Sequence, residues 1–137
     1  MTLILCLDDR NGMAFNGRRQ SMDAQLRSRM LQKVGNERLW MSTYSARQFE
    51  PLPVNVFADD DFLNKAEADN ACFAETQVSS ECLHRCRKLI VYRWNKVYPA
   101  DEFFLFSEIA DRLKLISTED FAGYSHERIT EEIYEVN

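Results

Sequence analysis

The chain has few residues that interrupt or cross-link a fold: four glycines, three prolines and four cysteines in 137 residues. So little glycine and proline excludes a collagen-like, low-complexity or linker-rich protein. Apolar runs stay well below the roughly 18–20 residues of a membrane span, and the start Met1–Leu7 is too short for a secretory signal. We therefore expect one cytoplasmic domain, residues 1–137, with no membrane partner.

Metal ligands are also scarce. The only histidines are His84 and His126, and the cysteine pair Cys82 and Cys86 has no second pair of ligands nearby. A structural zinc site needs four ligands, so we expect packed, reduced thiols and no metal. We also expect no other cofactor. No serine or cysteine stands in a recognisable nucleophile motif, so no catalytic residue is assigned and His126 is expected at the surface.

Positive charge is unevenly distributed. The net charge of −5 argues against long nucleic acid as a partner, yet residues 10–47 carry eight basic and only two acidic side chains. A second basic cluster runs from Arg85 to Lys96. If the two segments meet, they create a local positive potential that attracts a small anionic ligand. The acidic turns, among them Asp8-Asp9, are interpreted as solvated bends.

Apolar periodicity predicts an α/β domain with a mixed sheet and a C-terminal antiparallel hairpin. Strands are expected at Leu3–Leu7, Arg38–Ser42, Val54–Ala58, Ala71–Ala74, Lys88–Trp94, Leu113–Ser117 and Arg128–Val136. Helices are expected from Ser21 or Asp23 to Val34, and at Ser45–Phe49, Phe62–Ala68 and Val78–Cys86. Residues 12–20, with Asn16-Gly17 inside them, are expected to form a loop with two bends.

The order of these elements resembles the dihydrofolate reductase family. The resemblance rests on Asn11-Gly12-Met13-Ala14-Phe15-Asn16-Gly17, which is similar to the family's active-site loop, and on Lys88-Leu89 through Phe103-Phe104, which is similar to its penultimate segment. Leu113–Ser117 and Thr130–Glu135 are similar to its closing hairpin. The resemblance implies the reductase fold and, as one functional hypothesis, a divergent NADPH-dependent reductase.

The departures from the family fall where the resemblance places its chemistry. The carboxylate of the first helix is replaced by Gln25, and Asp23 would point to another face of that helix. The Gly-Gly pair beside the cofactor corresponds to Ala74-Glu75, where a carboxylate would repel phosphate. Arg18-Arg19-Gln20 replaces a Leu-Pro-Trp triplet. We therefore favour a reductase scaffold without the reductase reaction.

A second, local resemblance is to small bacterial proteins labelled ribonuclease Z, through Asp8–Met13, Arg18–Ser21 and Tyr92–Asn95. It implies a nuclease or other hydrolase as a further alternative. A two-zinc hydrolase site needs a histidine cluster that two imidazoles cannot supply.

The favoured hypothesis is a non-catalytic protein that binds or sequesters a small anionic, nucleotide-like ligand, with a use in phage or bacterial defence. Arginines beside aromatic residues at loop and strand ends suit a flat ring with an anionic tail. The predicted ligand site comprises Asn11, Arg18, Arg19, Gln20, Trp40, Tyr44, Arg93 and Trp94. A homo-oligomer is expected, because a shortened sheet leaves open edges and Phe103, Phe104 and Phe106 form an aromatic cluster.

Overall fold

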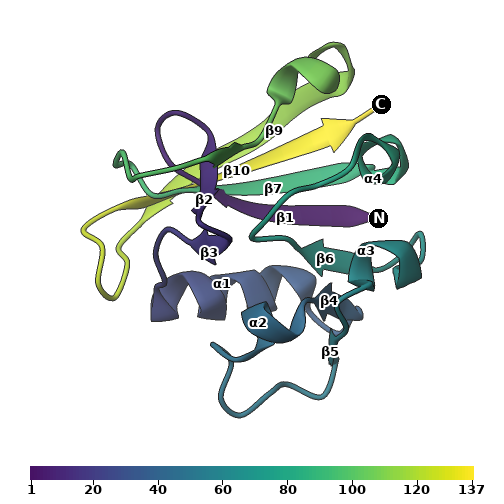
Figure 1. Ribbon diagram of the computed structural model, residues 1–137, viewed down its shortest axis with the longest axis horizontal. Helices are drawn as coiled ribbons and strands as arrows, with labels where there is room; N and C mark the ends of the chain where they lie inside the picture. The colour runs from purple at the N-terminus through teal and green to yellow at the C-terminus, as the bar shows by residue number, and fades with distance from the viewer.

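A seven-stranded mixed sheet forms the centre of the molecule in the computed structural model, which describes residues 1–137 (Figure 1). Its strand order is β5-β4-β6-β1-β7-β10-β9. The strands are β1 (Thr2–Leu7), β4 (Leu39–Met41), β5 (Val56–Ala58), β6 (Ala71–Phe73), β7 (Lys88–Arg93), β9 (Leu113–Phe121) and β10 (Ile129–Val136). The helices are α1 (Ala24–Val34), α2 (Thr43–Ala46), α3 (Phe62–Lys65) and α4 (Ser80–Arg85), with short 3-10 turns at Phe106–Glu108 and Ala110–Arg112. None of the helices combines the length and apolar character that a membrane crossing requires.

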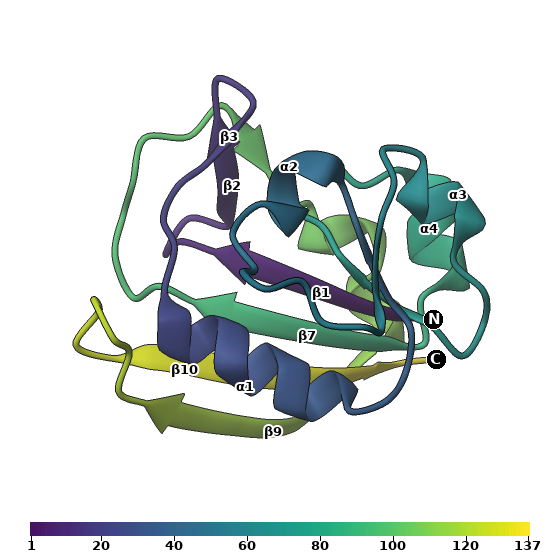
Figure 2. The same ribbon diagram turned by 90° about the horizontal axis from the view of Figure 1, so that it is seen from below.

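The central strands are apolar because both of their faces are covered. β1 pairs in parallel with β6 and β7, and Leu3, Ile4 and Leu5 are each fully buried. On one face, α1 packs over the sheet (Figure 2). On the other face, side chains from α3, α4 and residues 104–109 form a second core against the same strands.

Helix α1 follows from its sequence. Leu26, Met30 and Val34 recur every four residues, and they are the helix's buried residues. Asp23 caps the first turn by accepting hydrogen bonds from the backbone N–H groups of Gln25 and Leu26. Gly35, with φ of 63° and ψ of −126°, ends the helix in a positive-φ conformation that glycine adopts without strain.

The predicted mixed sheet and C-terminal antiparallel hairpin are confirmed. β10 runs antiparallel to both β7 and β9, and β9 is longer than predicted, reaching Phe121. Residues 12–20 were expected to be a loop, but they form a hairpin of β2 (Gly12–Phe15) and β3 (Arg18–Arg19). The reason is Asn16-Gly17: both residues have positive φ, which suits a tight two-residue hairpin turn. β8 (Glu102–Phe103) adds a third strand to this second sheet.

Candidate functional site

Asp8 organises the chain at the carboxyl end of β1. Its buried carboxylate accepts hydrogen bonds from the backbone N–H of Gly12 at 2.7 Å and of Tyr98 at 3.2 Å, and from the Gln20 amide at 3.0 Å. Burial by itself would raise the Asp8 pKa, but these donors, with the N–H of Arg10, outweigh it and lower the pKa. The prediction of a solvated bend is therefore wrong at Asp8. The turn is formed around this buried carboxylate, which accepts hydrogen bonds from the backbone N–H groups of Arg10 and Gly12.

Arg93, the last residue of β7, lies at the same end of the sheet. One guanidinium nitrogen donates to the Asn11 side-chain oxygen at 2.6 Å and to the Asp8 carbonyl at 3.1 Å. Its Nε donates to Glu132 at 3.1 Å. Two of the predicted site residues, Asn11 and Arg93, are thus in contact. Arg93, however, already pairs with the carboxylate of Glu132.

Arg19 and Tyr44 form a second pair. The Arg19 guanidinium lies 4.0 Å from the centre of the Tyr44 ring, and its Nε donates to Glu75 at 2.9 Å. Glu75 also accepts from the Ser45 hydroxyl at 2.8 Å and from the Gln48 amide at 3.0 Å. Glu75 is buried rather than solvated: its side chain is 5% exposed and forms an ion pair with Arg19.

The remaining predicted residues have varied surroundings. Gln20 donates to Asp8, which Arg93 also contacts, and Arg18 is exposed at the start of β3. Trp40 is in the middle of β4, where its indole N–H donates to Asn70. Trp94 is buried and packs against the His126 ring, with ring centres 4.6 Å apart. Asn11, Gln20 and Arg93 thus meet at Asp8 and Arg19 meets Tyr44, whereas Arg18, Trp40 and Trp94 have other surroundings.

His126 is buried, although the sequence placed it at the surface. Its Nδ1 lies 2.9 Å from the Asp23 carboxylate and its Nε2 lies 2.9 Å from the Ser21 hydroxyl. The Tyr98 hydroxyl is 3.3 Å from the same Nε2. Ser21 and Asp23 are 105 and 103 residues from His126 along the chain, so no local motif signals the cluster.

Cys72, Cys82 and Cys86 are buried, as expected, whereas Cys6 of β1 is half-buried. Burial raises the pKa of Cys72 to about 12 and that of Cys82 to about 11. These thiols therefore stay protonated at neutral pH and act as small apolar side chains.

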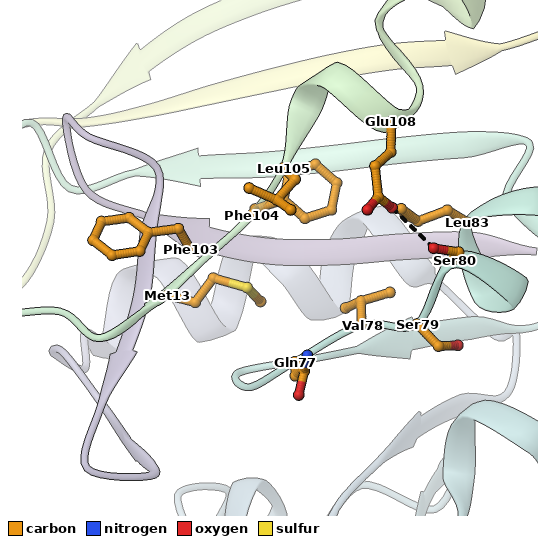
Figure 3. A pocket seen from close by; sticks show the side chains of 10 residues that line it. All are labelled: Met13, Gln77, Val78, Ser79, Ser80, Leu83, Phe103, Phe104, Leu105 and Glu108. Carbon is orange, nitrogen blue, oxygen red and sulfur yellow. Dashed lines mark hydrogen bonds between the residues drawn. The ribbon is translucent and has the colours of Figure 1, made fainter.

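A cavity of about 170 Å³ opens between β2, the segment before α4 and the segment after β8 (Figure 3). Met13, Val78, Leu83, Phe103, Phe104 and Leu105 supply its apolar surface, and Gln77, Ser79, Ser80 and Glu108 supply its polar groups. The Ser80 hydroxyl donates to Glu108 at 3.2 Å, as the dashed line in Figure 3 shows. These residues come from three separate segments, so no local motif in the sequence marks them as a site.

Two further cavities adjoin this one. One shares Ser80, Leu83 and Glu108 with it and adds His84, Ile109 and Arg112, with a volume of about 340 Å³. The other, about 450 Å³, shares Gln77 and Ser79 and includes the acidic residues Asp60 and Asp61. The two adjoining cavities thus differ in charge: one combines Arg112 with Glu108, and the other contains Asp60 and Asp61.

Comparison with known proteins identifies the fold and no closer relationship. No family model and no curated protein matches the sequence. Among solved structures, dihydrofolate reductase from Enterococcus faecalis, complexed with NADP(H) and RAB-propyl, is similar with a TM-score of 0.66 and 14% sequence identity. The match covers 99% of this chain and 95% of the reductase chain. The molecule has the architecture of dihydrofolate reductase.

Proposed function

We propose that this chain is a binding protein for a small nucleotide-like ligand on a dihydrofolate reductase scaffold. The observation that carries the proposal is the cavity next to Met13, Val78 and Phe103, in which apolar walls and a few polar groups converge. The ring of the ligand occupies this cavity and its anionic tail extends toward Arg112. Sequestration of a signalling nucleotide is the use we favour.

The size of the cavity supports a single ring system. Pockets for drug-sized molecules measure about 300–1,000 Å³, and a cavity of about 150 Å³ holds a benzene ring. At about 170 Å³, this cavity fits one planar ring of nucleobase type, with the rest of the ligand outside it. The Ser79 and Ser80 hydroxyls, the Gln77 amide and the Glu108 carboxylate offer partners to the polar edge of such a ring.

The charged residues near the cavity support an anionic ligand tail that extends toward Arg112. Arg19 and Arg93, the predicted partners of the anion, are paired with Glu75 and Glu132. Arg112 lies in the adjoining cavity, where its Nε donates to the Asn137 carbonyl and its Nη1 donates to the Leu83 carbonyl, which leaves the N–H groups of Nη2 for an anion. In the other adjoining cavity, Asp60 and Asp61 repel phosphate.

Thermal unfolding with added ligands tests the proposal, because a ligand that binds the folded state raises the melting temperature. We expect a nucleoside monophosphate to stabilise the chain more than the free nucleobase does. Val78→Phe should abolish both effects by filling the cavity, while Arg112→Gln should remove only the advantage of the phosphate. Lys114→Gln, on exposed β9, is the matched control and should change neither.

Two results would overturn the proposal: no shift with any nucleobase or nucleotide, or shifts that survive Val78→Phe. The divergent reductase remains the alternative, because the similar structure is a complex with NADP(H). Stabilisation by NADPH together with its oxidation in the presence of dihydrofolate would establish that alternative instead.

A further inference from the structure

Three side chains at the start of α1 are connected in the order serine, histidine, aspartate. The Ser21 Oγ lies 2.9 Å from His126 Nε2, and His126 Nδ1 lies 2.9 Å from Asp23 Oδ2. Ser21 precedes the helix cap Asp23 by two residues, and His126 comes from the turn between β9 and β10. Because the groups come from two segments, their connection is a product of the fold.

Asp23 is suited to orient the imidazole. Its carboxylate accepts from the backbone N–H groups of Leu26, Tyr124 and Ser125 as well as from His126. Burial alone would raise the Asp23 pKa, but these hydrogen bonds together keep it well below its ordinary range. An ionised carboxylate only accepts hydrogen bonds, so the facing nitrogen, Nδ1 of His126, carries the proton.

That assignment determines the chemistry at the other ring nitrogen. With the proton on Nδ1, neutral His126 presents a lone pair at Nε2, toward which the Ser21 hydroxyl points its hydrogen. The indole of Trp94 stacks on the imidazole at 4.6 Å and restricts rotation of the ring. Ser21 itself is partly exposed, whereas His126 and Asp23 are buried.

We propose that Ser21 is a reactive nucleophile, activated by His126 and oriented through Asp23, that takes up acyl groups from small activated esters. The hydrogen-bond order is that of a nucleophile, its general base and the acid that fixes the base. This activity is independent of the ligand cavity beside α4, because none of the three residues lines that cavity.

The reaction balances with these groups alone. The Ser21 oxygen attacks the ester carbonyl carbon as its proton passes to His126 Nε2, and the bond to the leaving alcohol then breaks. The alcohol departs with the proton from Nε2. Water, deprotonated by the same nitrogen, then attacks the acyl-serine carbonyl. The bond to Ser21 Oγ breaks, Oγ takes the proton back from Nε2, and the carboxylic acid is released.

Two neighbouring groups add to the proposal. When Ser21 donates to Nε2, the Tyr98 hydroxyl, 3.3 Å from that nitrogen, is free to donate to a developing oxyanion. His126 also lines a cavity of about 310 Å³ with Trp94, Asn95, Lys96, Glu127 and Arg128. Lys96 and Arg128 outnumber the single carboxylate Glu127 there, which favours an ester whose acyl part is negatively charged over one whose acyl part is positively charged.

A fluorophosphonate probe tests the nucleophile directly, because attack by a serine forms a phosphorus–oxygen bond and expels fluoride. We expect one adduct on the purified chain by intact mass, mapped to Ser21 after proteolysis. Ser21→Ala should lose the adduct and keep its melting temperature within a few degrees. Ser28→Ala, which removes an exposed serine of α1, is the matched control and should be labelled like the unmodified chain.

The base is tested with His126→Gln and Asp23→Asn, both checked for folding by circular dichroism. If the cluster is reactive, folded His126→Gln should label at least 100-fold more slowly and Asp23→Asn at least tenfold more slowly. If the contacts only tie the hairpin turn to α1, the unmodified chain will give no adduct at millimolar probe. Labelling that persists in Ser21→Ala, or that ignores the loss of His126, would also overturn the proposal.

Discussion

Single buried carboxylates hold distant segments of this molecule together. Asp8, Asp23, Glu75 and Glu131 are all buried, and each accepts several hydrogen bonds. Glu131 of β10, for example, accepts hydrogen bonds from two guanidinium nitrogens of Arg29 in α1 and from the hydroxyl of Tyr92. Since an ion in the interior is costly unless it is paired, each of these groups needs all of its donors.

The Arg19–Glu75 pair gives a quantitative prediction. Removing one partner of a buried ion pair leaves the other charge unpaired, so Glu75→Ala should lower the free energy of unfolding by about 3 kcal/mol. The double variant Arg19→Ala/Glu75→Ala should lose less than the sum of the two single variants. Urea unfolding measures both effects. Additive losses would show that the two side chains do not interact.

Acid stability should depend on Asp23. A carboxyl whose pKa is lower in the folded than in the unfolded chain stabilises the fold above its ordinary pKa of about 3.9. This stabilisation is lost as the pH falls from the pKa of the unfolded chain through the lower pKa of the folded chain. The Asp23 pKa is lowered in the fold, so Asp23→Asn should cost stability at pH 7 and progressively less below about pH 4. Urea unfolding at several pH values checks this, and a loss that does not change with pH would contradict it.

At the scale of elements, the hairpin of β2 and β3 depends on a close approach at Gly12. A β-carbon there would lie 2.7 Å from Gln20 Nε2, 2.8 Å from Asp8 Oδ2 and 2.9 Å from the Ala100 β-carbon. Gly12→Ala should therefore destabilise the chain by about 1–3 kcal/mol, the range for overpacked interiors. Gly17→Asn is the control, since its turn position is open and asparagine tolerates positive φ. Equal melting temperatures for the two variants would refute the steric explanation.

Most elements could be predicted from local sequence, but the site could not. The apolar run of β7 and the four-residue spacing of α1 are local signals, and the structure has both elements close to the predicted bounds. The β2–β3 hairpin was missed because its strands are only four and two residues long. The burial of His126 and Glu75 depends on partners far away in sequence, and a single sequence does not show which partners meet.

At the scale of the whole molecule, self-association stays a prediction. Phe104 is buried and Phe106 packs against Tyr134, so Phe103 is the exposed ring of the expected aromatic cluster. The edge strand β9 carries exposed Leu115 and Ile116, but a bulge and charged residues limit its pairing with another strand.

If the chain associates through its aromatic surface, light scattering at micromolar concentration should give a dimer or larger species. Phe103→Ser should then reduce the mass to that of a monomer. The matched control Tyr124→Ser, which removes another exposed aromatic ring, should leave the mass unchanged. A monomeric unmodified chain would contradict the prediction.

The strand register places the first and last strands of the chain on either side of β7, with their ends close together. Thr2 of β1 and Glu135 of β10 both pair with Lys88 of β7, so the two ends of the chain lie about 10 Å apart, two strand spacings. A short glycine linker could join them, and new ends could be opened at the exposed segment Leu52–Val54. Such a circular permutant should give the same far-ultraviolet circular dichroism spectrum. The sheet would then be assembled from the same strands read in a rotated order, starting at β5.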